Sequence, residues 1–237
     1  MSSFLIFDGK NSLDYGVQIE KYPSRPYPER IYDSYTVPGR SGSLVYDTKA
    51  YNNVTQDYEC YFKNSMASSY EMERYLTAWL LQPKGYRILE DSYDPEVFRK
   101  AIFAGPVDVS SFFAKYGRCT LEFNCQPQRW LKSGRNAIDA ENGMQLWNDG
   151  EPALPLIRVL GSGSGTISIG TSIIQLSQIP EGLTIDAETQ NIYAGTQNYN
   201  HIATITGGFP VLPSGKAGVS YSGGIAAVSI TPRWWIL

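Results

Sequence analysis

The 237-residue sequence carries a formal net charge of −3, with 42% hydrophobic and 18% charged residues. This composition is typical of a globular chain rather than a disordered one. No stretch approaches the ~20 apolar residues that a membrane-spanning helix needs, and no Lys/Arg cluster offers the cations that nucleic-acid phosphates require. The first four residues, MSSF, lack the basic region and apolar core of a secretion signal, so we expect synthesis in a cytoplasm.

Charge and glycine are distributed unevenly along the chain. Residues 1–132 hold 16 Lys+Arg and 16 Asp+Glu, whereas residues 133–237 hold only 4 and 7 but carry 15 of the 22 glycines. A fall in charge with a rise in glycine marks a change of domain. We therefore predict one domain over residues 1–132 and a second over residues 133–237, with residues 132–136 (KSGRN) as the linker.

The first half is predicted to be an α+β sheet domain built from short strands. The Asp8-Gly9 pair predicts a tight turn after the first strand, and three prolines, Pro23, Pro26 and Pro28, predict an extended, exposed connection. Alternating apolar segments predict strands at residues 4–7, 15–19, 31–37, 44–46, 58–62, 86–89, 97–103, 107–113 and 117–125.

One main helix is predicted over residues 69–82. Ser68 and Glu71 have the spacing of a capping box, and Pro83 with Gly85 ends the helical pattern. Apolar residues recur at intervals of three and four, which forms a single stripe of Met72, Tyr75, Leu76, Trp79 and Leu80. We expect this stripe to pack against the sheet rather than to line a cofactor slot.

The second half is predicted to be almost entirely β. Strand patterns occur at residues 156–160, 166–169, 172–176, 183–186, 191–193, 202–205, 218–221 and 227–230. Turn signals separate them at residues 161–165, 180–182 and 222–224. Short strands with turns at this spacing are typical of a two-sheet sandwich or jelly roll.

The three cysteines have no metal-ligand spacing. In residues 119–125 (CTLEFNC), the period of two predicts one strand face made of Cys119, Leu121, Phe123 and Cys125. Cys60 is expected to share a face with Tyr58 and Phe62. Buried apolar thiols are therefore favoured over a redox or metal-binding role.

No group of residues indicates catalysis. The single histidine, His201, has no nucleophile motif to accompany it, so a surface or capping role is favoured. The GSGSG segment at residues 161–165 precedes a predicted strand, whereas a phosphate-binding loop precedes a helix. The carboxylate pairs Asp91/Asp94 and Asp186/Glu188 lie in predicted turns, where acidic residues are common. We predict no catalytic residues, no cofactor and no metal site.

The sequence ends with four large apolar residues, in TPRWWIL. Such a segment must pack into something, because exposed it would promote aggregation. Trp234 and Trp235 are expected in a final strand inside their own domain, with a subunit interface as the alternative. Residues 37–43 (VPGRSGS) likewise allow two interpretations, a plain hairpin tip or a protruding contact arm.

Several of these motifs together resemble those of siphophage distal tail proteins, in the short form without an inserted carbohydrate-binding module. The amino-terminal motifs are at residues 15–20 (YGVQIE), 37–42 (VPGRSG) and 85–91 (GYRILED). The carboxyl-terminal motifs are at residues 167–170 (ISIG), 183–186 (LTID), 191–193 (NIY), 208–210 (GFP) and 232–235 (PRWW). The resemblance covers nearly the whole chain, in order.

The resemblance implies a non-enzymatic structural protein of the virion tail tip, made in the cytoplasm of the bacterial host. It implies that the first domain is tail-tube-like and forms a hexameric ring, and that the second is a galectin-like β-sandwich. The implied partners are other copies of the chain, the tail-tube protein, and tail-associated lysin, tail-fibre or receptor-binding proteins. Phage DNA would pass through the ring without specific binding, and no membrane insertion is implied.

A cyclic ring joins one surface of each copy to a different surface of the next, and sheet edges and hairpins supply such contacts. We therefore predict that the subunit interface includes Val37, Pro38, Gly39, Arg40, Ser41, Gly42, Ser43 and Leu44. The main rival hypothesis is a carbohydrate-binding protein that recognises cell-wall polysaccharide through stacking aromatics such as Trp147, Tyr193 or Tyr199. A wall-degrading hydrolase comes third, since no acid/base pair stands out.

Overall fold

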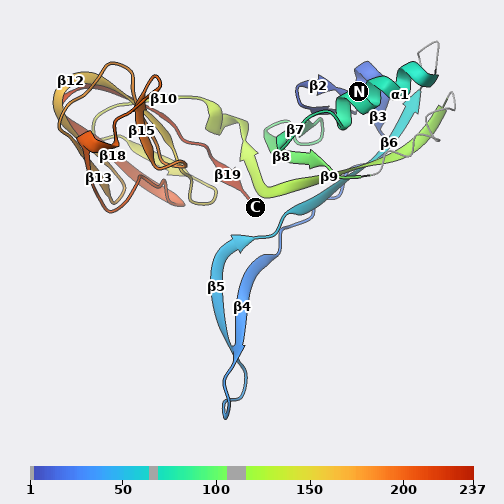
Figure 1. Ribbon diagram of the computed structural model, residues 1–237, viewed down its shortest axis with the longest axis horizontal. Coiled ribbons are helices and arrows are strands. Elements are labelled where there is room, and N and C mark those ends of the chain that lie inside the picture. Colours follow the sequence, from blue (N-terminus) through green and yellow to red (C-terminus); the bar gives the residue numbers. More distant parts are fainter. Residues whose placement is uncertain (1–2, 64–68, 106–115) are drawn as a thin grey trace. The chain divides into compact units, whose positions relative to one another are not determined.

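The computed structural model describes residues 3–63, 69–105 and 116–237 (Figure 1). The chain divides into two compact units, Met1–Arg129 with Leu237 (unit 1) and Trp130–Ile236 (unit 2). Residues 132–135 of the expected linker form a short 3-10 helix, η3 (Lys132–Arg135). The division of the chain into functional domains at residue 132 stays a prediction.

Unit 1 is built on an antiparallel sheet with the strand order β2-β1-β7-β8-β9-β6-β3. Its strands are β1 (Leu5–Phe7), β2 (Lys10–Asn11), β3 (Val17–Ile19), β6 (Val54–Lys63), β7 (Arg87–Asp91), β8 (Val97–Phe103) and β9 (Tyr116–Leu131). A separate two-stranded sheet is formed by β4 (Arg30–Thr36) and β5 (Ser43–Tyr51). The strand predicted at residues 107–113 lies outside the described residues.

The start of the chain folds as its turn residues predict. Asp8 and Gly9 both have positive φ, 51° and 76°, which gives the tight turn between β1 and β2. Tyr15 was expected in the next strand, but it ends a 3-10 helix, η1 (Ser12–Tyr15), because the left-handed Gly16 closes that turn. Pro23 was expected to be exposed with the rest of its connection, and it is buried instead.

The helix α1 (Ser69–Leu80) confirms the predicted helix and packs into the core of unit 1. Leu76, Trp79 and Leu80 are at most 2% exposed. Tyr75 was wrongly assigned to the buried stripe, since it is 53% exposed and faces away from the core. Ser68 of the capping box lies outside the described residues, as does the side chain of Met72.

Trp79 anchors the helix through an aromatic stack and a hydrogen bond. Its ring stacks on that of Tyr15 with a centroid distance of 4.7 Å and an interplanar angle of 4°. Its indole Nε1 donates to the carbonyl oxygen of Phe7 at 3.1 Å, so the buried polar atom is satisfied. The predicted packing of the helix against the sheet is therefore confirmed.

The remaining core of unit 1 comes from alternate positions of β6 and β9. Leu121, Phe123 and Cys125 are at most 2% exposed, as the period of two predicts. Tyr58 and Cys60 are each 1% exposed on β6. The three thiols are free, with Cys60 and Cys125 buried and Cys119 half-buried, so the expectation of apolar cysteines in strands is confirmed.

Unit 2 is a network of antiparallel strands with the order β10-β18-β12-β14-β15-β16. In addition, β11 pairs with β18, β13 with β12, and β17 with β13. The strands are β10 (Ile138–Ala140), β11 (Gln145–Asn148), β12 (Leu156–Ile169), β13 (Ser172–Leu176), β14 (Leu183–Asp186), β15 (Asn191–Ala194), β16 (Gln197–Asn198), β17 (Ala203–Thr206), β18 (Gly215–Thr231) and β19 (Trp235–Ile236). A single cluster of buried aliphatic side chains fills the interior.

Two predicted turns in unit 2 are not turns. Residues 161–165 lie inside the continuous strand β12, and residues 222–224 lie inside β18. The two segments face each other where the pairing register shifts between Leu160 and Gly165. Glycine is required for this close approach of the two strands, because a Cβ on Gly161 would collide with the carbonyl oxygen of Gly224. The glycines therefore mark bulges with close backbone approach, not hairpin loops.

Candidate assembly surfaces

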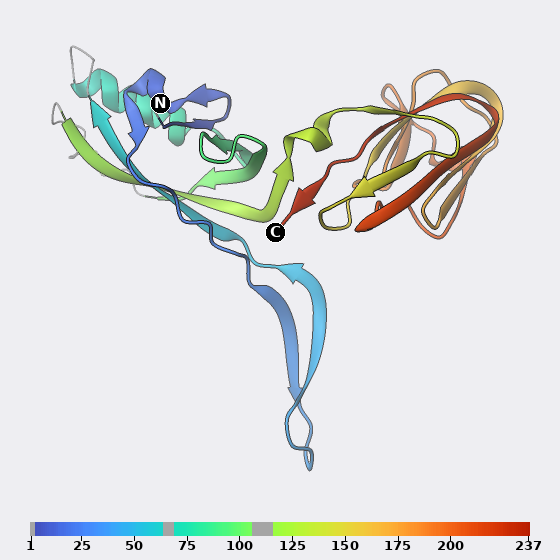
Figure 2. The ribbon, with the colours of Figure 1, turned by 180° about the vertical axis from the view of Figure 1, so that it is seen from behind.

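The hairpin of β4 and β5 extends away from the main sheet of unit 1 (Figures 1 and 2). The two strands pair from Arg30↔Tyr51 to Thr36↔Ser43, with a register shift between Ile31 and Tyr32. Every residue of β4 is exposed, as are most of those in β5. The two strands of the hairpin are therefore stabilised mainly by their contacts with each other.

The hairpin base is held by a small polar cluster. The guanidinium of Arg30 donates to Asp47 at 2.9 Å and to the hydroxyl of Tyr51 at 2.7 Å. Asp47 also accepts from the backbone N–H of Lys49 at 2.8 Å, and Lys49 has a left-handed φ of 59°. This polar cluster lies at the bulge where the pairing register of β4 and β5 shifts.

The predicted contact residues form the tip of this hairpin. The backbone N–H of Arg40 donates to the carbonyl oxygen of Val37 at 3.2 Å, and Gly39 and Gly42 have φ of 79° and 82°. Val37 is half-buried, and the other seven predicted residues are exposed. The hairpin-tip interpretation is confirmed, whereas contact between this tip and another subunit stays a prediction.

The arms of the hairpin carry an apolar surface that the sequence reading missed. Its large apolar side chains and their exposed fractions are Ile31 36%, Tyr32 59%, Tyr35 58%, Leu44 44%, Val45 65% and Tyr46 65%. Tyr35 pairs with Leu44 on one face, and Val45 pairs with Ser34 on the other. An isolated two-stranded hairpin is marginally stable in water, so this surface suits burial by a partner. The signal in the sequence was apolar residues at consecutive positions of both arms.

The second predicted contact residues, Trp234 and Trp235, pack inside unit 2. Both are half-buried against its core cluster. The Nε1 of Trp235 donates to the carbonyl oxygen of Pro152 at 3.0 Å, and the carbonyl oxygen of Trp235 accepts from Glu151 at 3.0 Å. The structure thus packs both side chains on the core of their own unit, with Trp235 in the final strand β19 and Trp234 just before it. A role between subunits stays a prediction.

Neither candidate carboxylate pair is arranged as an acid/base pair. Asp186 and Glu188 both contact Arg233, at 2.7 and 3.2 Å. Asp91 caps a turn by accepting from the backbone N–H of Tyr93 at 2.8 Å. Asp94 is bound by arginine side chains, as described below. Each carboxylate therefore stabilises local structure.

The aromatics considered for sugar stacking come from different segments of unit 2. Trp147 is 58% exposed and donates to Asp149 from the same short segment. Tyr199 packs on the core of unit 2, and its ring stacks on that of the exposed His201 at 5.9 Å. Tyr193 lies on β15, paired with Asn198. None of these three aromatics lines the groove described next.

An open groove of about 430 Å³ lies on unit 2 over β10, β12 and β18. Its lining mixes charged and apolar side chains: Asp139, Ala140, Glu141, Arg158, Leu160, Tyr221, Ala227, Val228 and Ser229. Leu160 is 57% exposed, so one wall is apolar. Small-molecule sites have volumes of roughly 300–1,000 Å³, and the groove falls within that range.

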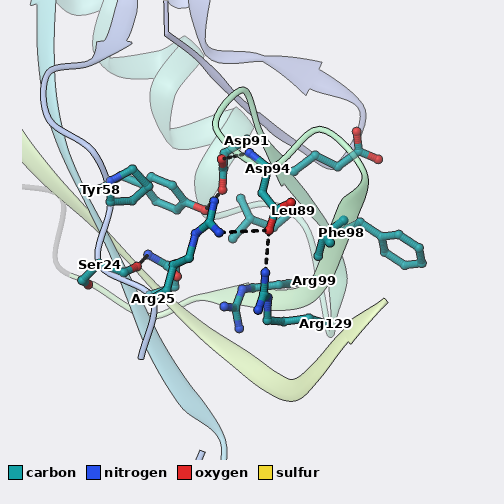
Figure 3. Close-up of a pocket in the computed structure, with 13 residues that line it drawn as sticks. Ser24, Arg25, Tyr58, Leu89, Asp91, Asp94, Phe98, Arg99 and Arg129 are labelled. Atoms are coloured by element: carbon teal, nitrogen blue, oxygen red, sulfur yellow. Dashed lines mark hydrogen bonds and ion pairs between the residues drawn. The ribbon is translucent and has the colours of Figure 1, made fainter. Parts of the chain in front are cut away.

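Unit 1 has a smaller polar pocket beside the turn between β7 and β8 (Figure 3). Asp94 accepts from the Nη2 of Arg129 at 2.6 Å, and Arg25 lies 3.8 Å from the same oxygen. Tyr58 donates its hydroxyl to Asp91 at 3.0 Å. Burial, followed by the negative charge of Asp91, raises the pKa of Tyr58 well above its usual value. The phenol therefore stays protonated and remains a donor.

Among the described residues, no three His, Cys, Asp or Glu side chains are placed to share a metal ion. No helix in the described part of the chain is long and apolar enough to cross a membrane.

No protein-family model and no curated protein matches this sequence. Solved structures do match. The crystal structure of Dit (gp 19.1) of phage SPP1, a paradigm of the hub adsorption apparatus in phages that infect Gram-positive bacteria, matches over 100% of both chains with a TM-score of 0.74 and 14% identity. A chain of the phage P2 baseplate, in its activated conformation with Ca, matches over 97% of both chains with a TM-score of 0.53 and 10% identity. The chain has the fold of the SPP1 Dit protein over its whole length.

Proposed function

We propose that the chain is a structural hub protein of a phage tail tip. The observation that supports this most strongly is the likeness to SPP1 Dit, which extends through both units with a TM-score of 0.74. A match confined to one unit would indicate a shared module, whereas this one covers 100% of both chains. The P2 baseplate match points to the same class of assembly.

In this proposal six copies form a ring that joins the tail tube to the baseplate or host-adhesion apparatus. Residues 1–132 form the ring, and residues 133–237 form a galectin-like β-sandwich on which tail-fibre, lysin or receptor-binding proteins dock. Phage DNA passes through the ring without specific contacts. The chain acts as a non-enzymatic part of the tail tip.

The exposed hairpin of unit 1 is the surface that best suits contact between copies. A ring needs two different complementary surfaces on each copy, and a protruding arm is one such surface. The apolar residues Tyr35, Leu44 and Tyr46 lie on one face of the arm, and they become buried when the arm lies on a neighbour. Burial of this area is the source of the binding energy, because it removes apolar surface from water.

The test is the oligomeric state of purified protein, measured by native mass spectrometry and negative-stain microscopy. We expect six-membered rings for the wild type and monomers for the double variant Arg40→Asp with Leu44→Asp. A matched control, Leu81→Asp with Lys84→Asp, makes the same charge change at two exposed residues beyond α1. We expect the control to form rings.

Circular dichroism and thermal unfolding should show that both double variants are folded. Rings that survive in the Arg40/Leu44 variant would refute the placement of the interface at the hairpin. Wild-type protein that stays monomeric at high concentration would contradict the ring itself.

A second candidate function, saccharide binding, is favoured by the groove on unit 2. Tyr221 offers an aromatic face, and Asp139, Glu141 and Arg158 offer hydrogen-bonding groups of the kind that orient polar ligands. Titration calorimetry with purified cell-wall polysaccharide tests this. Saturable binding that Tyr221→Ala abolishes would support it, and the absence of binding would reject it.

A further inference from the structure

The arm of the hairpin, residues 32–36 of β4 and 43–46 of β5, does not alternate between apolar and polar side chains. In an antiparallel sheet with one face in water, apolar residues occupy every second position, because successive side chains point to opposite faces. Leu44, Val45 and Tyr46 instead form a run of three consecutive apolar residues, and all three are exposed. Such a run is unfavourable on a strand that stays in water, so it indicates contact on both faces of the arm.

The pairing register assigns the side chains of the arm to its two faces, because residues that pair across the strands share a face. The first face holds Asp33, Tyr35, Leu44 and Tyr46, and the second face holds Tyr32, Ser34, Thr36, Ser43 and Val45. The run of apolar residues on β5 therefore contributes to both faces.

Large apolar side chains are exposed to a similar extent on the two faces. On the first face, Tyr35 is 58%, Leu44 44% and Tyr46 65% exposed. On the second face, Tyr32 is 59% and Val45 65% exposed. A neighbour that covered only the first face would leave Tyr32 and Val45 in water.

Charge is nearly absent from the arm. The hairpin carries Arg30, Asp47 and Lys49 at its base and Arg40 at its tip, and Asp33 is the one charged residue between them. Three tyrosines lie in the same stretch. Depletion of charge together with enrichment in tyrosine is typical of the core of a protein interface.

The rest of unit 1 does not cover either face. β4 and β5 form a two-stranded sheet of their own, and Figures 1 and 2, which view the chain from opposite sides, both show it extending away from the main sheet of the unit. Every residue of the arm is exposed in the described part of the chain. Whatever buries the arm therefore comes from outside unit 1.

We propose that other copies of this chain bury both faces of the arm in the assembled ring. This arrangement rests on the proposed ring and specifies how the arm enters it, since the arm is enclosed between surfaces of other copies and not laid on one surface. The two faces are opposite sides of a single two-stranded ribbon, so an arm that enters the junction between copies brings both into that junction at once. Another copy is favoured over a different protein as the cover, because assembly of the chain with itself then removes the whole apolar surface from water.

The test changes the second face alone and measures the oligomeric state by native mass spectrometry and sedimentation velocity. Tyr32→Ser with Val45→Ser should abolish rings at a concentration at which the wild type forms them, because the second face no longer contributes apolar burial. The matched control, Tyr75→Ser with Val211→Ser, also removes one exposed tyrosine and one exposed valine, from positions outside the hairpin. We expect the control to form rings.

A second measurement covers the case in which the serine variant loosens the hairpin itself. Val45→Cys is a small change that places a thiol on the second face, while Cys60 and Cys125 are buried and Cys119 is half-buried. Its labelling by a maleimide should be slower in rings than in the same substitution made in the Arg40→Asp, Leu44→Asp background, by roughly tenfold or more, since the thiol reacts only when the contact opens.

The outcomes separate this arrangement from the ring on which it rests. Rings that persist in the Tyr32/Val45 variant, or a Val45→Cys thiol that is labelled equally fast in rings and in monomers, would overturn the burial of the second face and leave the ring intact. That second face would then be free for a different protein. Wild-type protein that forms no ring would overturn both.

Discussion

Arg233 and Asp186 form a two-point ion pair, with Nη1–Oδ1 and Nη2–Oδ2 distances of 2.7 and 3.2 Å. Arg233 has a left-handed φ of 57°, and its backbone N–H donates to the carbonyl oxygen of Gly134 at 2.8 Å. The pair therefore fixes the segment after β18 to β14 and turns the final residues back toward the start of unit 2. Parallel guanidinium–carboxylate bonds of this kind are among the stronger polar interactions in proteins.

This ion pair should make unit 2 sensitive to acid. Burial alone would raise the pKa of Asp186, but the hydrogen bonds and charge of Arg233 outweigh it, and the net pKa lies below the usual value. A carboxylate with a lowered folded-state pKa contributes stability above its unfolded value of about 3.9, and this is lost as pH falls through the folded value. Asp186→Asn should lower the free energy of unfolding at neutral pH by about 1.5–3 kcal/mol.

Urea unfolding followed by tryptophan fluorescence at several pH values checks this. The difference between wild type and Asp186→Asn should shrink as pH falls below about 4, where the wild-type carboxylate becomes protonated. Glu181→Gln, at an exposed turn residue of the same unit, is the control and should change stability little at any pH. A pH-independent difference for Asp186→Asn would show that the charge is not what stabilises the contact.

Removal of Trp79 should destabilise unit 1 strongly. The side chain is fully buried, stacks on Tyr15 and donates to Phe7, so Trp79→Ala leaves a cavity and an unsatisfied carbonyl. We expect a loss of about 3–5 kcal/mol in the free energy of unfolding. Tyr75→Ala on the exposed face of the same helix should cost less than about 0.5 kcal/mol, measured by urea unfolding under the same conditions. Equal losses would mean that the helix does not pack through this face.

The glycine at position 150 should be intolerant of substitution. A Cβ there would collide with the carbonyl oxygen of Trp235, which accepts the hydrogen bond from Glu151. Gly150→Ala should therefore lower the unfolding free energy by at least about 2 kcal/mol, since a backbone segment must move. A Cβ on Gly182 would meet no atom within 4 Å. Gly182→Ala should therefore lower the unfolding free energy only by the cost of a positive φ, about 1 kcal/mol. Thermal unfolding of the two variants side by side separates the effects, and a smaller loss for Gly150→Ala would contradict the close approach.

The three thiols should be unreactive in the folded protein. Burial raises the pKa of Cys119 and of Cys125 to about 12, and burial followed by the proximity of Cys119 raises that of Cys60 further. The thiolate is the reactive form, so alkylation with iodoacetamide at mildly alkaline pH should be slow. Denaturation should release three equivalents at once, as counted by mass spectrometry. Rapid labelling of native protein would contradict the buried placement.

The sequence predicted individual elements well where local chemistry determines them. The Asp8-Gly9 turn, the helix that ends before Pro83 and the alternating face of Leu121 and Phe123 all follow from backbone sterics and periodicity. The tip of the hairpin could also be recognised, because its glycines need positive φ. The resemblance of the motifs also indicated the fold that the SPP1 Dit structure shares.

Tertiary structure decided the features that depend on what a residue meets across space. The glycines near positions 161 and 224 look like loop residues in sequence, yet they lie inside long strands. The two bulged backbones approach each other so closely there that a side chain on either strand would collide with the other. Arg99 looks like an ordinary strand residue, and only the packing of β8 against Leu89 shows that its charged side chain is buried. Periodicity reports which positions share a face, but the energy of a buried glycine or cation depends on neighbours that are distant in the chain.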